Sequence, residues 1–416
     1  MKKNYPAQLV FSFVLLVSSL SSFAQHDCSS GRFSTLNYFD SVVVTKGVKF
    51  GSNTKVGSSG NQDLFFDFYE PYNDTLSKRP LIVLEFGGSF VSGSRDQLHA
   101  LCIQFAKMGF TTATIDYRVG FFFPNQITTT HAVIRAMHDM KAAVRYFYKD
   151  AATINTFKID TNYIIAGGVS AGAIGAVHCA YMNNNEVPPY FYNDTAGIGG
   201  TEGLSGNPGY SSKVAGVISY SGAIGDTNWI GNNDLPIISF HDDLDNVVYY
   251  DTREAEVGGF KTGLVASGSG DLHIRANHMG IANKLITIPN STGHVSYIPN
   301  PAMNQADSVL LESTLTSTMN FIADLVCGKL VSVKNQPHKY TELLVYPNPA
   351  IDEVTLEVLS ETQKSLVQLF DISGKQLLEK TITSKTTLSL NEFSSGIYFL
   401  KVSSNSNTST QKLVVK

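Results

Sequence analysis

The sequence predicts an α/β domain with a mostly parallel sheet, followed by a small all-β sandwich domain. Two observations support this prediction. From residue 25 to about residue 330, short apolar runs alternate with segments of helical periodicity, which is the pattern of an α/β sheet. After residue 340, short runs of alternating polarity follow one another with turns between them, which is typical of a small β-sandwich.

The apolar runs of the first region have the length of strands. Leu64, Phe66 and Phe68 recur at period two, and residues 111–117 are rich in β-branched side chains. The predicted strands are residues 64–68, 81–86, 111–117, 163–166, 214–220, 237–240 and 285–288. Most of these runs are continuously apolar, so we expect a sheet covered on both faces.

Helical periodicity is clearest in residues 131–148, where apolar side chains recur every three or four residues. The predicted helices are residues 131–148, 173–182 and 307–327. Residues 183–212 are different, because they are rich in Asn, Gly, Pro and Tyr and lack periodicity. We interpret them as a long loop, either a lid in which residues 190–192 shape the pocket or an ordinary surface insertion.

The first 24 residues have the features of a signal peptide. Lys2 and Lys3 precede an apolar run at 9–20, and small residues precede a cleavage site at Gln25. The run is too short to span a bilayer comfortably, and no later segment reaches about 18 apolar residues, so we expect no transmembrane segment in the mature chain.

The expected organisation is a signal peptide (1–24), an α/β domain (25–330), a linker (331–340) and a C-terminal domain (341–416). The predicted strands of the C-terminal domain are residues 353–358, 366–370, 377–382, 387–390, 397–402 and 412–415.

Charge and cysteine content exclude several functions. The chain has a formal net charge of −4 and no basic stripe, so a nucleic-acid partner is not expected. Four cysteines allow three pairings, and the sequence does not choose among Cys28, Cys102, Cys179 and Cys327. Cys179 lies on the apolar face of a predicted helix, which suggests a buried thiol. No residues have zinc-ligand spacing, and the cluster at 242–246 lacks the glycine and glutamate of an EF-hand, so we expect no metal.

A candidate nucleophile lies between a predicted strand and a predicted helix. Residues 168–172 read Gly-Val-Ser-Ala-Gly, and in this strand–turn–helix context the pattern indicates a nucleophile elbow with Ser170 at its tip. The turn is sharp, so its flanking residues must be small. The following helix directs its amide groups and dipole at the site where an oxyanion develops. The alternative is a tight turn with an incidental serine.

A serine hydroxyl is a weak nucleophile and needs a base, in the chain order Ser, then Asp or Glu, then His. Asp245 follows the predicted strand 237–240, and His294 follows the predicted strand 285–288. Both lie at the carboxyl ends of strands, where sites gather in open α/β sheets. We therefore predict Asp245 as the acid and His294 as the base. The competitors are Asp242 and Asp243 for the acid, and His241, His273 and His278 for the base.

A glycine motif supplies the third element. Gly87, Gly88 and Ser89 directly follow the predicted strand 81–86, and small residues there let backbone amides approach a substrate carbonyl. Together with the amide of Ala171 they would complete an oxyanion hole. The alternative is a glycine turn that ends a strand.

These residues resemble a known family. The span from about 64 to 299 is similar to the esterase/lipase branch of the α/β-hydrolases, in particular to bacterial carboxylesterases of the hormone-sensitive-lipase and feruloyl-esterase-like groups. The matching residues are Phe68-Tyr69-Glu70-Pro71, Gly87-Gly88, Asp116-Tyr117-Arg118, Asp139, Ala142-Ala143, the elbow, Asp245 and His294. The resemblance implies an oxyanion hole formed by the amides of Gly88, Ser89 and Ala171. Where these enzymes usually carry His-Gly-Gly-Gly, this chain has Phe86-Gly87-Gly88-Ser89, which leaves the loop geometry and the subfamily open.

The C-terminal domain resembles the sorting domain of the type IX secretion system. The matching residues are Tyr346-Pro347-Asn348-Pro349, Asp371-Ile372-Ser373-Gly374, Gly396-Ile397-Tyr398 and Gln411-Lys412-Leu413-Val414-Val415-Lys416. This resemblance implies a partner, the type IX machinery, and a product that is secreted or attached to the cell surface. A carbohydrate-binding sandwich is the alternative.

Together, the two resemblances imply a secreted serine esterase that needs no cofactor and acts on small or polymer-linked esters. A serine peptidase on the same fold would share every catalytic residue, but the chain has no room for a gating domain. A catalytically silent binding protein usually loses a triad member, and none is missing here. Simple acyl esters, feruloyl or acetyl groups on plant polysaccharides, and polyesters all remain open as substrates.

Overall fold

The computed structural model describes residues 28–183, 186, 199–298, 308–330, 343–346, 348–358, 364–383, 385–404 and 407–416. The predicted signal peptide (1–24), the predicted linker (331–340) and residues 190–192 lie outside the described residues. The chain divides into two compact units, Met1–Val333 and Lys334–Lys416.

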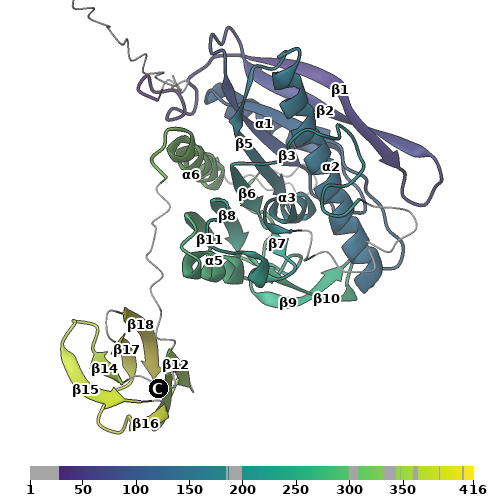
Figure 1. Ribbon diagram of the computed structural model, residues 1–416. Helices are drawn as coiled ribbons and strands as arrows, with labels where there is room; N and C mark the ends of the chain where they lie inside the picture. The colour runs from purple at the N-terminus through teal and green to yellow at the C-terminus, as the bar shows by residue number, and fades with distance from the viewer. Residues whose placement is uncertain are drawn as a thin grey trace, which may run out of the picture. The chain divides into compact units, whose positions relative to one another are not determined.

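An eight-stranded sheet forms the centre of the first unit (Figure 1). Its strands are β1 (Val42–Thr54), β2 (Asn61–Pro71), β3 (Arg79–Glu85), β4 (Thr111–Ile115), β5 (Ile159–Val169), β6 (Gly216–Tyr220), β8 (Ile237–Asp242) and β11 (Asn283–Ile288). Their order in the sheet is β1-β2-β4-β3-β5-β6-β8-β11, and all pairings from β4 to β11 are parallel. The prediction of a mostly parallel sheet is therefore confirmed. β1 escaped prediction because it lies at the edge of the sheet, where most of its side chains remain partly or fully exposed.

Helices cover both faces of this sheet, as the continuous apolar runs predicted. The helices are α1 (His99–Lys107), α2 (Gln126–Ala152), α3 (Ala171–Tyr181), α5 (Ser269–His278) and α6 (Ser308–Val326), with 3₁₀ turns η1 (Arg95–Leu98) and η3 (Thr227–Trp229). Ile82 and Ile165 pack in a core with α1 and α6, whereas Leu81 and Ile164 pack in a core with α2. Neighbouring residues of one strand thus pack in cores on opposite faces of the sheet, because successive side chains of a strand point to opposite faces.

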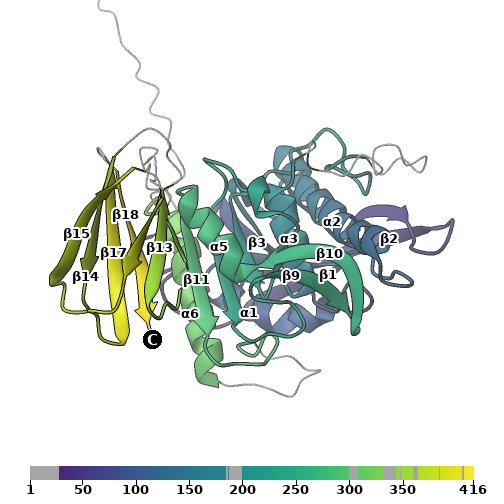
Figure 2. The ribbon, with the colours of Figure 1, turned by 90° about the horizontal axis from the view of Figure 1, so that it is seen from below.

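A second, three-stranded sheet was not predicted. It consists of β7 (Ala223–Ile224), β9 (Thr252–Val257) and β10 (Phe260–Gly268), in the order β7-β10-β9. Figure 2 shows the β9–β10 hairpin beside α2. Its turn is Gly258-Gly259, with φ angles of 60° and 79°. Two left-handed residues are what a tight hairpin turn requires, so this Gly-Gly pair was a usable hairpin signal in the sequence.

Residues 199–212, the longest described part of the predicted loop or lid, pack on α2 and β1. Asp139 of α2 accepts hydrogen bonds from Ser205 Oγ (2.5 Å) and from the guanidinium of Arg118 (3.0 Å at Nη2). Arg145 of α2 donates to the carboxylate of Glu202 at 3.0 Å. The described residues of this loop therefore form a tightly anchored insertion on the side of α2.

The second unit is all-β, as predicted. One sheet contains β12 (Leu343–Tyr346), β13 (Glu353–Val358) and β16 (Lys385–Ser389), and the other contains β14 (Ser365–Phe370), β15 (Gln376–Ile382), β17 (Gly396–Ser404) and β18 (Asn407–Val415). Val354, Leu369, Leu400 and Leu413 are fully buried in one core cluster. Alternate side chains of both sheets form this core, which is the arrangement of a β-sandwich.

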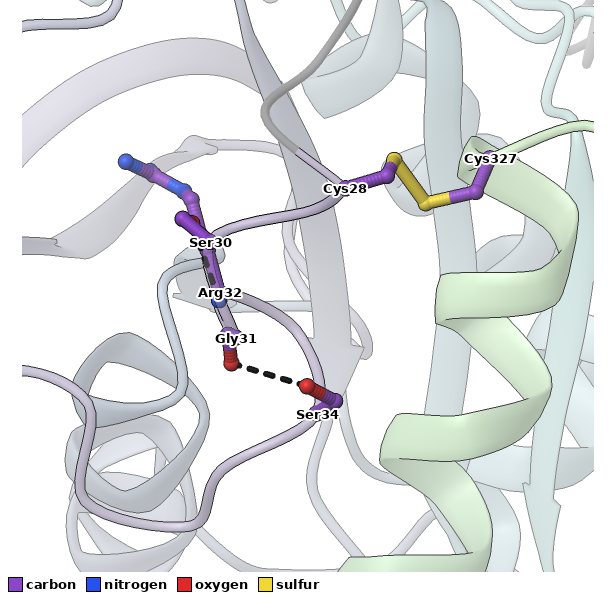
Figure 3. The surroundings of a disulfide bond; sticks show 6 residues. All are labelled: Cys28, Ser30, Gly31, Arg32, Ser34 and Cys327. Atoms are coloured by element: carbon purple, nitrogen blue, oxygen red, sulfur yellow. Dashed lines mark hydrogen bonds between the residues drawn. A yellow bond between two sulfur atoms is a disulfide. The ribbon is translucent and has the colours of Figure 1, made fainter.

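One disulfide closes the first unit. Cys28 bonds Cys327, with a Cα–Cα distance of 6.1 Å and a sequence separation of 299 (Figure 3). The bond ties the N-terminal segment to the residue that follows α6. Cys102 and Cys179 are buried free thiols, which confirms the prediction for Cys179.

We predict that reduction of this disulfide lowers the melting temperature of the protein, because the bond restricts a very long loop of the unfolded chain. Loss of a native disulfide typically costs about 2–5 kcal/mol. Thermal unfolding with and without dithiothreitol measures the effect. The double variant Cys28→Ala/Cys327→Ala is the control, and it should unfold at the same temperature with and without reductant. A wild-type melting temperature that reductant does not change would contradict the prediction.

Candidate active site

Ser170 lies in a strained turn between β5 and α3. Its φ and ψ angles are 55° and −119°, a region that residues with a side chain rarely adopt. The turn depends on two glycines. A Cβ atom on Gly168 would overlap the backbone of Gly172, and one on Gly172 would overlap the carbonyl group of Glu85. α3 therefore packs backbone to backbone against the ends of β3 and β5, and this packing holds Ser170 at the tip of the turn.

The structure brings together the three residues predicted as a triad. His294 Nε2 lies 2.8 Å from Ser170 Oγ, and His294 Nδ1 lies 2.7 Å from Asp245 Oδ2. Because a carboxylate only accepts, Nδ1 carries the proton and donates it to Asp245. The lone pair of Nε2 is then free to accept the hydroxyl proton of Ser170. This is the geometry of a nucleophile, a base and an acid that orients the base.

Asp245 is buried and well supplied with donors. Its Oδ1 accepts the backbone amides of Val247 (2.8 Å) and Val248 (3.1 Å). Burial alone would raise the pKa of Asp245, but hydrogen bonds from His241, His294 and the Val247 amide outweigh it and lower the pKa to about 2. A carboxylate stabilised in this way remains charged and can stabilise an imidazolium on His294.

The competing histidines occupy other positions. His241 is fully buried, with Nδ1 2.8 Å from Ser269 Oγ and Nε2 2.8 Å from the carbonyl oxygen of Val248. Nε2 thus holds the loop that carries Asp245 and also lies 3.5 Å from Asp245 Oδ2, whereas Nδ1 bonds the first residue of α5. His273 and His278 lie on α5, and burial lowers the pKa of His273 to about 4.

The competing acids contact the turn of His294 rather than its ring. Asp242 Oδ1 accepts the hydroxyl of Ser291 at 2.5 Å, and Asp242 also accepts the hydroxyl of Ser296. Asp243 Oδ1 accepts the backbone amide of Ser291 at 3.1 Å. Three acids from one strand end therefore meet the same segment, and among them Asp245 bonds the imidazole.

The predicted oxyanion loop bends sharply beside the elbow. Gly88, Ser89 and Phe90 have φ angles of 130°, 54° and 61°. A Cβ atom on Gly87 would lie 3.2 Å from Ser170 Cβ, so the loop passes directly against the nucleophile. Ser89 and Ala171 line the same cavity as Ser170, whereas Gly88 does not. The assignment of these backbone amides to an oxyanion hole stays a prediction.

A largely apolar cavity of about 310 Å³ opens beside Ser170. Its walls come from α2, α3, η3 and the β9–β10 hairpin, and include Val133, Ile174, Met182, Trp229, Leu264 and Val265. The hairpin and Trp229 line this cavity, and neither was predicted from the sequence. The described residues 199–212 do not line this cavity, whereas residues of the β9–β10 hairpin do.

His178 lies in the cavity wall, and both of its ring nitrogens are hydrogen-bonded within the protein. His178 Nδ1 donates to the carbonyl oxygen of Ile174 at 2.8 Å, and Nε2 accepts the amide of Gly225 at 3.3 Å. Burial lowers the pKa of His178 to about 4, so the ring is neutral at physiological pH. Its edge-on contact with Trp229, with ring centroids 5.6 Å apart, closes this part of the cavity with aromatic surface.

Neither a metal cluster nor a membrane-spanning helix is found in the described part of the chain. No three or more His, Cys, Asp or Glu side chains lie close enough there to hold a metal ion. None of the helices described is long and apolar enough to cross a membrane.

Two family models match separate parts of the chain. Residues 66–224 match the family described as BD-FAE, and residues 344–416 match the one described as Secretion system C-terminal sorting domain. The chain carries an α/β-hydrolase domain of the BD-FAE type. The match to BD-FAE includes the glycine loop and Ser170 and ends before Asp245 and His294. This match supports the assignment of the domain as a carboxylic ester hydrolase. The sorting domain indicates export through the type IX secretion system, to the cell surface or the medium.

Solved structures of Thermogutta terrifontis esterase 2 are similar to this chain. The form phosphorylated by paraoxon is 21% identical in sequence, with a TM-score of 0.48. The match covers 70% of this chain and 96% of the esterase chain. The propionate-bound form is 22% identical, also with a TM-score of 0.48. That match covers 67% of this chain and 95% of the esterase chain. No curated protein sequence matches the chain.

The low pKa of Asp245 predicts an acid-dependent contribution to folding. Its pKa is about 2 in the folded protein and about 3.9 in an unfolded chain, so the folded state binds the proton more weakly. The stabilisation is fully present above about pH 5 and is lost as the pH falls toward 2. Between these limits, the free energy of unfolding of the wild type should fall by on the order of 2 kcal/mol more than that of Asp245→Asn. Urea unfolding at a series of pH values measures both slopes, and equal slopes would contradict the assignment.

Proposed function

We propose that the protein is a secreted serine esterase that hydrolyses carboxylic esters through an acyl-enzyme on Ser170. The observation that carries this proposal is the continuous contact from Ser170 Oγ through His294 to Asp245, at the wall of an apolar cavity. Residues 1–24 would direct export as a signal peptide, and residues 331–340 would link the hydrolase domain to the sorting domain.

In the first half of the reaction, His294 Nε2 accepts the proton of Ser170 as Oγ attacks the ester carbonyl. Asp245 stabilises the imidazolium that forms. The carbonyl oxygen becomes an oxyanion, which the amides of Gly88, Ser89 and Ala171 would stabilise together with the N-terminus of α3. His294 then protonates the departing alcohol, and the acyl group remains on Ser170.

In the second half, water replaces the alcohol. His294 takes a proton from the water as it attacks the acyl carbon, and then returns that proton to Ser170 Oγ as the acid leaves. The apolar walls of the cavity would hold the acyl chain during both steps. An apolar chain gains roughly 0.8 kcal/mol for each methylene group that it buries. No cofactor enters this sequence of steps.

The proposal predicts that Ser170→Ala loses turnover of p-nitrophenyl acetate and butyrate by a factor of 10³ or more, since the nucleophile is removed. Release of p-nitrophenol measures the rate, and circular dichroism checks the fold. The control is Ser212→Ala, a serine on the loop that packs against α2, which should keep the wild-type rate. A folded wild type that is no faster than Ser170→Ala on any ester would refute the esterase proposal. Peptide substrates would then be tested next.

Trp229 is predicted to limit the length of the acyl chain. Its ring lies against His178 and Gly225 in the cavity wall, so Trp229→Ala should lengthen the cavity. We expect kcat/KM for p-nitrophenyl octanoate, relative to butyrate, to rise by about tenfold, which is within the range for a hydrophobic pocket. Trp229→Phe keeps an aromatic ring and should keep most of the wild-type preference. An unchanged ratio in Trp229→Ala would place the acyl chain elsewhere.

A further inference from the structure

The base of the proposed triad lies on an irregular turn. His294 belongs to the segment after β11, where Asn290 and Val295 have φ angles of 56° and 57°. No helix or strand ladder determines the direction of this segment, so other contacts must hold the imidazole in reach of Ser170. Two backbone bonds join it to the loop after β8: the Asp243 amide donates to Ile288 O at 3.2 Å, and the Leu244 amide to Ser291 O at 3.0 Å.

Asp242 binds this turn on both sides of His294. It is the last residue of β8 and is fully buried. Its Oδ1 accepts the hydroxyls of Ser291 (2.5 Å) and Ser296, and its Oδ2 accepts the Ser296 amide at 3.2 Å. Ser291 Oγ in turn accepts the amide of Gly293 at 3.2 Å. One carboxylate thus connects the segments before and after His294.

The turn also packs closely on this carboxylate. A Cβ atom on Gly293 would lie 3.4 Å from Asp242 Oδ1, 3.2 Å from Ser291 Oγ and 2.9 Å from Ser296 Cβ. Only a residue without a side chain fits between the two serines without displacing one of them. All side-chain hydrogen bonds of Asp242 to described residues come from neutral donors of this turn. A buried acid is costly unless it is fully bonded, so loss of these bonds would loosen the turn.

We propose that Asp242 is a positioning residue for the base, acting through Ser291 and Ser296 to hold His294 Nε2 at hydrogen-bond distance from Ser170 Oγ. The two acids then have separate tasks. Asp245 orients the imidazole ring and stabilises its positive charge, whereas Asp242 holds the backbone that carries it. This inference rests on the proposed function, because it assigns a role within the same reaction.

Three variants of the purified protein test this assignment. Asp242→Asn keeps the size of the side chain but replaces one acceptor oxygen by a donor. Ser296→Ala removes one hydroxyl and no charge. Asp150→Asn is the matched control, since Asp150 is a buried acid that accepts two backbone amides of one turn, Thr156 and Phe157 at 3.0 Å each, at the end of α2. Asp150→Asn should therefore lose stability without moving His294.

The expected results separate positioning from folding. For p-nitrophenyl butyrate, kcat should fall 10- to 100-fold in Asp242→Asn and three- to tenfold in Ser296→Ala, with KM within twofold of the wild type. In the double variant Asp242→Asn/Ser296→Ala, kcat should fall by less than the product of the two single factors, because both changes break the same contact. In Ser296→Ala the acid limb of kcat/KM should move to lower pH, since a displaced imidazole contacts Asp245 less well. No charge is lost in that variant, so the shift reports position alone.

Two outcomes would overturn the proposal. One is a kcat in Asp242→Asn no lower than in Asp150→Asn at a comparable melting temperature. The other is a double variant whose kcat falls by the full product of the two single factors, together with a Ser296→Ala variant whose acid limb does not move. If Asp242→Asn does not fold, Ser296→Ala decides through its kcat and acid limb.

The rate at which a fluorophosphonate labels Ser170 separates this proposal from the proposed function. Labelling needs the base but no ester substrate. If the wild type is labelled yet hydrolyses no ester, the proposed function fails, and positioning is still judged from labelling. Slower labelling of Ser296→Ala than of Asp150→Asn would support it, and equal labelling would overturn it.

Discussion

The close packing of α3 on the ends of β3 and β5 is the constraint on which the rest of the site depends. Gly168 and Gly172 permit a separation at which any Cβ atom would meet backbone. Ser170 is held at positive φ because the strand and the helix on either side of it leave no alternative path. The same approach places Gly87 against the nucleophile, so the elbow and the glycine loop share a single packing contact.

The remaining parts of the site come from strand ends that are less regular. Asp245 and His294 lie on loops after β8 and β11, where no ladder determines their direction. Buried polar groups replace the ladder there. Asp245 accepts two amides of its own loop, His241 bonds the carbonyl of Val248, and Asp242 and Asp243 bind the turn of His294. Such a network is rigid when every member is bonded, so it can hold His294 Nε2 at 2.8 Å from Ser170 Oγ.

The pocket has a different physical basis from the triad. Its walls are largely apolar side chains of α2, α3, η3 and the β9–β10 hairpin, and the lining histidine, His178, has both ring nitrogens engaged. In the proposed esterase, the triad would attack the ester carbonyl, and the hairpin would limit which acyl chains fit. The two parts are separate in sequence, so the pocket can vary while the chemistry stays the same.

Much of this protein was predictable from local patterns in its sequence. Continuous apolar runs indicated the doubly covered sheet, and the Gly-Val-Ser-Ala-Gly turn and the acid and histidine after later strands indicated the triad. These patterns are local because strand burial and a sharp turn restrict residue types over a few positions. β1 and the β9–β10 hairpin escaped because most of their side chains are partly or fully exposed, although Gly258-Gly259 marked the hairpin turn. The choice among three acids, the pairing of Cys28 with Cys327 and the composition of the cavity wall were decided only by the tertiary structure. Each depends on which residues, far apart in sequence, come within a few ångströms of one another, and no local pattern encodes that distance.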